Sequence, residues 1–198
     1  MNVFLTMSGF LFPLITFPYV SRVLLPAGTG KVAFATSIIT YFSMFAQLGI
    51  PTYGIRACAQ VRDEKLELSR VTQELLILNL IMTVISYVAF ALMLVTVPKI
   101  ETEKPLFLIM SSMILLNSLG MEWLYKALEE YTYITVRSVF FKLLSVGAMF
   151  CLVKTPDHYV RYGAISIFAS SASNFLNFIY AHKFVFLRPV HGYHLKRH

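Results

Sequence analysis

Two side chains of opposite charge, Glu122 and Lys142, stand in stretches that are otherwise apolar. Each lies ten residues from Thr132, the middle of the segment that joins the two stretches. At about 1.5 Å of rise per helical residue, antiparallel helices would bring both charges to the same depth. The spacing therefore predicts an ion pair that fixes a helical hairpin. A contact with a coupling ion or a substrate is an equally open interpretation, because ionisable groups inside a membrane are functional candidates.

Amide side chains form a second set of candidates, because Gln47, Asn174 and Asn177 belong to polar stripes at helical spacing. The stripes are Thr36, Thr40, Ser43 and Gln47; Ser111, Ser118 and Glu122; and Ser166, Ser170, Ser173, Asn174 and Asn177. Each set shares one helix face. Lipid cannot hydrogen-bond these groups, so the stripes should face protein or a wet cavity. Helix–helix contact is the favoured role for the hydroxyl side chains. For the amide side chains, lining a cavity is an equally open interpretation, because an amide has more polar groups that need hydrogen-bond partners.

Signatures of covalent or metal chemistry are poor in this sequence. Residues 28–31, Gly-Thr-Gly-Lys, resemble the end of a phosphate-binding loop, but Val32 replaces the hydroxyl residue and Leu25 the first glycine. His191, His194 and His198 lie on a basic tail without Cys or carboxylate partners, so we predict no metal site. We therefore predict that the protein is not an enzyme and uses no cofactor.

The stretches that carry these residues are long enough to cross a membrane. The composition is 57% hydrophobic and only 14% charged, against about 25% charged in soluble domains. Crossing a bilayer takes about 20 apolar residues in a helix. We predict an all-α integral membrane protein, a six-transmembrane-helix bundle that forms one lobe of a two-lobe transporter fold. The predicted helices are 1–21, 32–55, 75–98, 105–126, 137–153 and 161–181, followed by a basic cytoplasmic or interfacial tail at 182–198.

The first and fifth predicted helices are irregular. In the first, Pro13 and Pro18 should interrupt the backbone hydrogen bonds. The fifth has an uncharged run of only 11 residues, so it spans only if Arg137 and Lys142 reach the headgroups from its first turns. The alternative is a re-entrant or interfacial segment, which would reverse the last helix and the tail.

The distribution of basic residues predicts an orientation. Of the 17 Lys and Arg residues, 11 lie in the second and fourth connections and the tail, and 6 lie in the other connections. Basic residues mark the cytoplasmic side, so both termini are predicted to be cytoplasmic. Because the basic charge is spread over the connections, no nucleic acid partner is predicted. Cys58 and Cys151 are predicted to lie toward opposite membrane faces, which disfavours a disulfide.

Four local motifs, spread over nearly the whole chain, resemble a known family. They are residues 17–24 (FPYVSRVL) with 28–34 (GTGKVAF); 48–56 (LGIPTYGIR); 119–125 (LGMEWLY), continuing through Glu129 to Arg137 and Ser138; and 166–170 (SIFAS) with Asn174, Phe175, Asn177 and Phe178. In these motifs the chain resembles the oligosaccharide flippase (Wzx-like) family of the multidrug/oligosaccharidyl-lipid/polysaccharide exporter superfamily.

The resemblance implies two six-helix lobes around a central cavity that opens alternately to either side. It also implies transport of undecaprenyl-pyrophosphate-linked oligosaccharide repeat units across the bacterial inner membrane, for polysaccharide biosynthesis such as capsule, exopolysaccharide or O-antigen. Cationic cavity residues are implied to meet the pyrophosphate, and Arg22 and Arg56 occupy family-typical basic positions. Each Arg has an alternative role as a helix-end anchor.

Family members have about twice as many helices as are predicted here. The chain is therefore expected to be a truncated protein or a half-transporter that works with membrane lipid and with a second lobe or a homodimer partner. A cation-coupled drug exporter of the same superfamily is an open alternative, and it would need acidic cavity groups. A non-functional fragment is another open alternative. A membrane glycosyltransferase or polymerase has less support, because no large loop or clustered acidic site is seen.

Overall fold

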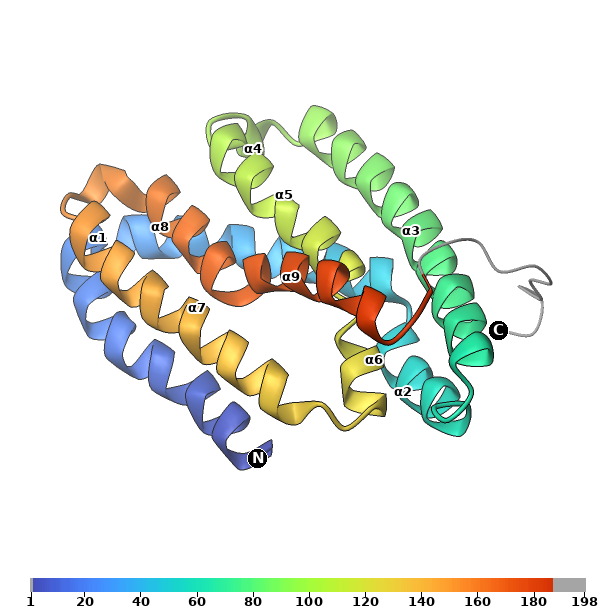
Figure 1. Ribbon diagram of the computed structural model, residues 1–198. Helices are drawn as coiled ribbons and strands as arrows, with labels where there is room; N and C mark the ends of the chain where they lie inside the picture. Colours follow the sequence, from blue (N-terminus) through green and yellow to red (C-terminus); the bar gives the residue numbers. More distant parts are fainter. Residues whose placement is uncertain (1, 187–198) are drawn as a thin grey trace.

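The computed structural model describes residues 2–186, with the side chains of 12–98 and 100–186, and its regular structure is helical (Figure 1). The longer helices are α1 (Asn2–Gln47), α2 (Ile50–Gln60), α3 (Lys65–Thr96), α5 (Lys104–Leu119), α7 (Tyr131–Leu152), α8 (Tyr159–Ile167) and α9 (Ser173–Tyr180). Shorter pieces are α4 (Pro98–Glu101), α6 (Glu122–Ala127), η1 (Pro156–His158), the π-helical segment η2 (Phe168–Ala172) and η3 (Ala181–Lys183). The three tail histidines lie outside the described residues.

Helix α1 consists of two helices that meet at Leu25. This residue has φ 59° and ψ 171°, which is not helical. Pro26 follows it, and a residue before proline is kept out of the helical region by the proline ring. The chain turns back at this point, so that the dark blue and light blue halves of α1 diverge in Figure 1. The main interruption therefore comes at Leu25, whereas Pro13 and Pro18 lie inside the helix that precedes it.

Two further breaks divide helices that were predicted to be continuous. Leu48 (φ 39°) and Gly49 (φ 77°) separate α1 from α2, and Met121 (φ 40°) separates α5 from α6. Glycine adopts a positive φ readily, but leucine and methionine do so rarely. Met121 is almost fully buried, which indicates that packing holds its backbone in place. The predicted helices 32–55 and 105–126 are each split in this way.

Four segments of the described chain are long and apolar enough to cross a membrane. They are Phe12–Gln60, Lys65–Thr96, Lys104–Ala127 and Tyr131–Leu152. The prediction of a helical integral membrane protein is thus confirmed, but four candidate spans are found where six were predicted. The first segment, of 49 residues, joins most of the first two predicted helices through Leu25. The last predicted helix is divided by η2 into α8 and α9, which are nine and eight residues long.

The polarity of the bundle is reversed relative to a soluble protein. On α3 the polar residues Asn79, Thr83 and Ser86 are buried, whereas Val88 and Val95 are exposed, the latter at 85%. Exposed apolar surface of this extent suits contact with lipid, and buried polar groups find their hydrogen bonds inside the bundle. The arrangement agrees with a membrane-embedded protein.

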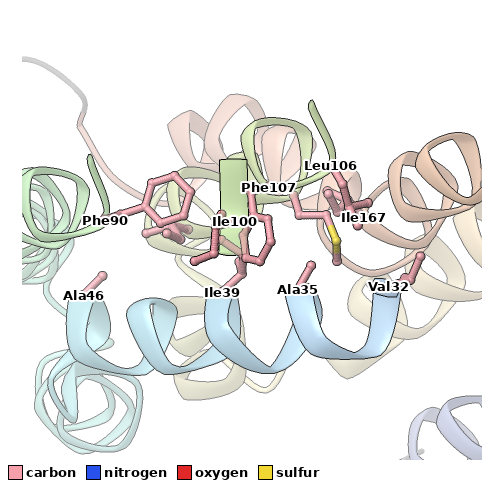
Figure 2. Close-up of a cluster of buried hydrophobic side chains, with 11 residues drawn as sticks. Val32, Ala35, Ile39, Ala46, Phe90, Ile100, Leu106, Phe107 and Ile167 are labelled. Atoms are coloured by element: carbon pink, nitrogen blue, oxygen red, sulfur yellow. The ribbon is translucent and has the colours of Figure 1, made fainter. Parts of the chain in front are cut away.

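An apolar core holds the second half of α1 against α5 and its neighbours (Figure 2). It consists of Val32, Ala35, Ile39, Ala46, Phe90, Ile100, Leu106, Phe107, Met110, Ile114 and Ile167. Ala35 and Ala46 are fully buried, and such small residues let helices approach closely in a membrane. The core thereby fixes α1 and α5, whose C-terminal ends lead directly into the two breaks at Leu48–Gly49 and Met121.

Candidate functional site

A cavity of about 250 Å³ lies where these two breaks meet helix α9. It is lined by Gln47, Pro51, Ile55, Asn117, Glu122, Trp123, Lys126 and Asn174. Three of the residues that the sequence singled out, Gln47, Glu122 and Asn174, therefore line a single cavity. They come from the end of α1, the start of α6 and the start of α9.

Two glycines allow the walls of the cavity to pack closely. A Cβ atom on Gly54 would lie 2.8 Å from the Trp123 ring, and one on Gly120 would lie 2.6 Å from the Asn174 Cγ atom. Both distances are shorter than real Cβ contacts. Helix α2 can thus lie against α6, and α9 against the end of α5, only because these positions carry no side chain.

A chain of amide hydrogen bonds joins three helices across the cavity wall. The Asn174 side chain donates to Asn117 Oδ1 at 3.1 Å, and the Asn117 side chain donates to Ser43 Oγ at 3.2 Å. These bonds connect α9, α5 and α1. The hydrogen bonds hold Asn174 at the cavity, and they use part of the hydrogen-bonding capacity of its amide group inside the bundle.

Two buried asparagines cap the broken end of α5. The last carbonyl groups of a helix have no partners within that helix. Asn79 donates to the Ser118 carbonyl at 2.9 Å, and Asn177 donates to the Gly120 carbonyl at 2.7 Å. Asn177 is fully buried and stands behind the cavity wall, so the structure places it as a support of the break. Within the described residues, the side-chain oxygens of Asn79 and Asn177 accept no hydrogen bond.

The charged residues of the cavity wall are Glu122 and Lys126. Their side chains form an ion pair with 2.8 Å between Glu122 Oε1 and Lys126 Nζ, one helical turn apart, and each side chain is about one third exposed. Lys142 lies on α7 and does not line the cavity. The predicted ion pair of Glu122 with Lys142 stays a prediction, and the partner that the structure shows is Lys126.

A third cation, Arg137, is buried on α7. Its side chain donates to the Ser173 carbonyl at 2.7 Å, and its guanidinium carbon lies 5.7 Å from the centre of the Tyr133 ring. The guanidinium Nε has no hydrogen-bond partner in the described part of the chain. Arg137 thus joins α7 to α9 directly beside Asn174.

Arg22 and Arg56 are exposed and do not line the cavity. Conversely, Lys126, Asn117 and Trp123 line it, although we did not select them from the sequence. A signal for Lys126 existed, because it follows Glu122 by four residues and therefore shares its helix face. Among the described residues, no group of three His, Cys, Asp or Glu side chains could hold a metal ion.

Three of the four motifs that supported the family resemblance contribute residues to this cavity, namely Pro51 and Ile55, Glu122 and Trp123, and Asn174. Comparison with known proteins decides the matter. The sequence matches the Polysaccharide biosynthesis protein family over residues 1–197. The chain belongs to this family. Two curated relatives carry the name "Putative O-antigen transporter". That of Escherichia coli (strain K12) is 24% identical over 167 residues, and that of Shigella dysenteriae is 27% identical over 153 residues.

These alignments cover 84% and 77% of the chain but only 39% and 38% of the relatives. The chain therefore spans about two fifths of the length of the curated relatives that it matches. No solved structure matches it. The family match confirms the resemblance that the sequence motifs indicated.

Proposed function

We propose that the chain forms one lobe of a transporter that moves undecaprenyl-pyrophosphate-linked oligosaccharide repeat units across the bacterial inner membrane for polysaccharide biosynthesis. The observation that carries this proposal is the cavity of amide and charged side chains at the helix breaks, within a chain of the polysaccharide biosynthesis family. Broken helices that line a cavity in a membrane protein are typical of transporters. A second lobe or a homodimer partner would complete the transport path.

In this proposal the chain crosses the membrane six times, with both termini in the cytoplasm. The two halves of α1 would each cross, and so would the combined segment α8–η2–α9. The excess of basic residues in the second and fourth connections supports the orientation. With Cys58 and Cys151 replaced by Ser, because Cys151 is exposed, we expect Arg62→Cys to react with a membrane-impermeant maleimide only after permeabilisation, and Asp157→Cys to react in intact spheroplasts. Labelling of Arg62→Cys from outside would contradict the orientation.

The chemistry proposed is binding and release without a covalent step, so no catalytic residue or cofactor is assigned. A cation-coupled drug exporter would use an acidic cavity group to receive its cation. The carboxylate that lines this cavity, Glu122, is already paired with Lys126. The arrangement therefore favours an anionic or polar substrate over a cationic drug.

Genetic complementation tests the proposed function. A strain that lacks its O-antigen transporter should regain surface polysaccharide when residues 1–198 are expressed together with the segment that supplies the second lobe. Lipid-linked oligosaccharide should move from the inner to the outer leaflet at the same time. Stable expression of both parts without surface polysaccharide would contradict the proposal.

A further inference from the structure

The segment that runs from α8 to α9 contains one turn that is not α-helical. This turn is the π-helical segment η2, Phe168–Ala172, between the α8 and α9 helices of Figure 1. A π-helix closes its hydrogen bonds from residue i to residue i+5, so the turn holds one residue more than an α-helical turn. Such bulges are rare and are frequent at functional sites. The bulge ends directly before Ser173 and Asn174, and Asn174 lines the cavity.

The extra residue decides which side chains of α9 point toward α5. Without it, each residue of α9 would lie one position further along, about 100° around the helix axis and 1.5 Å along it. Ser173 would then take the place of Asn174, and Leu176 would take the place of Asn177. The bulge is therefore the reason why Asn174 reaches the cavity and Asn177 caps α5.

The polar pattern of this segment matches an uninterrupted α-helix. Ser166, Ser170, Ser173 and Asn177 share one face at α-helical spacing. In the structure the bulge divides this stripe, because Ser173 and Asn177 are buried whereas Ser170 is exposed. Ser166 lines a different cavity, of about 440 Å³, between α8 and the two halves of α1. The sequence pattern thus indicates a straight helix, and the structure holds a bulged one.

Three hydrogen bonds hold α9 in the described register. Arg137, which is 7% exposed on α7, donates to the Ser173 carbonyl at 2.7 Å. The side chains of Asn174 and Asn177 donate to α5 at 3.1 and 2.7 Å. Hydrogen bonds from a charged donor contribute more than neutral ones, so Arg137 supplies the strongest of the three. A small number of side-chain contacts therefore decides between the two registers.

We propose that η2 is a register switch, in which the extra residue moves from η2 to the end of α9 and turns Asn174 out of the cavity. Arg137 is the positioning residue that favours the described register. In the shifted register Ser173 takes the place of Asn174, and the Asn177 cap on α5 is released. In the proposed transporter this shift accompanies the change of the cavity from one open side to the other. That role rests on the proposed function, whereas the register shift itself does not.

Cross-linking from α5 measures the register directly. In a full-length chain with both native cysteines replaced by Ser, Asn117→Cys would be combined in turn with Ser173→Cys, Asn174→Cys or Phe175→Cys and treated in detergent with a short bis-methanethiosulfonate linker. The described register predicts the Asn174→Cys cross-link, because the two side chains are in contact. The shifted register predicts the Ser173→Cys cross-link in addition. Phe175, which is 54% exposed, is the matched control and should stay unlinked in both registers.

Deletion of Ser170 separates a register shift from simple proximity of Ser173 to α5. Ser170 is exposed, and its hydroxyl bonds back to the Ser166 carbonyl within the same helical segment. The deletion removes the extra residue, so α9 keeps its described register without a bulge. The Asn174→Cys cross-link should therefore persist, and the Ser173→Cys cross-link should be lost.

Arg137→Leu tests the positioning residue. Without the charged donor, the ratio of the Ser173→Cys cross-link to the Asn174→Cys cross-link should rise about tenfold, the factor that corresponds to about 1.4 kcal/mol. Arg137→Lys retains a charged donor and should restore most of the original ratio. A merely structural role of Arg137 would lower the amount of folded protein and leave this ratio unchanged.

The inference is overturned if Asn174→Cys alone cross-links, or if Phe175→Cys cross-links as well, which would indicate general mobility of α9. It is also overturned if the Ser170 deletion keeps the Ser173→Cys cross-link or loses that of Asn174→Cys, or if Arg137→Leu leaves the ratio unchanged. Restored surface polysaccharide alongside any of these results would leave the proposed transport intact and remove only the switch.

Export by the Ser170 deletion tests the role of the switch in transport. Expressed with the segment that supplies the second lobe, the deleted chain should give no surface polysaccharide at a protein level at which the unmodified chain restores it. Normal export by the deleted chain would overturn this role. The predicted cross-links in an unmodified chain that does not complement would instead leave a register switch in a protein that is not this transporter.

Discussion

The second half of α1 and helix α5 are held in one way in the apolar core and in another way at the breaks beside the cavity. Around Ile39 and Phe107 the helices are continuous and packed through apolar side chains (Figure 2). At Gln47 and near Gly120 both helices end, and at the end of α5 the amides of Asn79 and Asn177 donate to the Ser118 and Gly120 carbonyl groups. The apolar core thus depends on shape, whereas the cavity depends on a few specific polar contacts.

This difference assigns a role to each region. Apolar packing in a bilayer rests on close contact, since lipid tails are as apolar as the side chains that they meet. The broken helix ends expose carbonyl groups that need partners, and those partners leave room for a polar cavity. We therefore expect substitutions in the core to change stability, and substitutions at the cavity to change transport.

The largest effect on stability is expected for Phe107→Ala in the apolar core. In soluble proteins the loss of a buried Phe side chain costs about 3–5 kcal/mol, but in a bilayer the part due to transfer from water is absent. We expect a loss of about 2 kcal/mol in the free energy of unfolding, measured by denaturant titration in mixed micelles. Phe140→Ala is the control, because Phe140 is 61% exposed and should change the free energy of unfolding by less than about 0.5 kcal/mol. Equal losses would contradict the assignment of the core.

A smaller loss of stability but a large loss of transport is expected for Asn177→Leu. The substitution removes the bond to the Gly120 carbonyl, and interhelical hydrogen bonds of this kind contribute about 1 kcal/mol in membranes. Transport should fall further than stability, because the break that shapes the cavity loses its cap. Ser112→Ala is the control, since the Ser112 hydroxyl bonds within its own helix. Unchanged transport at normal expression would contradict this role of Asn177.

The helices that form the apolar core were predictable from the sequence, whereas the cavity at the helix breaks was predictable only in part. Long uncharged runs predict helices in lipid, because the bilayer leaves the backbone few alternatives. The breaks at Leu25, Leu48 and Met121 carry no comparable signal, since leucine and methionine rarely adopt a positive φ. Packing holds the backbone in place at the buried Met121, whereas Leu25 and Leu48 are exposed. Pro26 and Gly49 are the residues beside two of these breaks whose backbone preferences favour a turn.

The residues of the site were likewise predictable from the sequence only in part. Gln47, Glu122 and Asn174 were predicted because polar residues in apolar runs are conspicuous. Lys126 was missed because it read as one of the topology-determining charges in the fourth connection. Arg22 and Arg56 were taken from the family motifs, and the exposed positions of both leave their substrate contacts as predictions.

The smallest effect is expected for Arg62→Gln at the surface beside the α6–α7 turn. Arg62 Nη1 lies 3.4 Å from Glu129 Oε1, and the two side chains are 47% and 73% exposed, respectively. Pairs of this exposure contribute less than about 0.5 kcal/mol to stability because solvent screens them. Neither the free energy of unfolding nor transport should change measurably. A loss of transport would extend the functional region beyond the cavity and the breaks.

The most direct test compares two ion pairs at opposite ends of the structure. Lys126 pairs with Glu122 at the cavity, and Lys104 pairs with Glu101 at 2.9 Å at the start of α5. Lys126→Gln and Lys104→Gln would each be introduced at the chromosomal locus of the native host, and surface polysaccharide would be measured at matched protein levels. We predict that Lys126→Gln abolishes export, whereas Lys104→Gln preserves it. Normal export with Lys126→Gln would contradict the assignment of the cavity as the transport site.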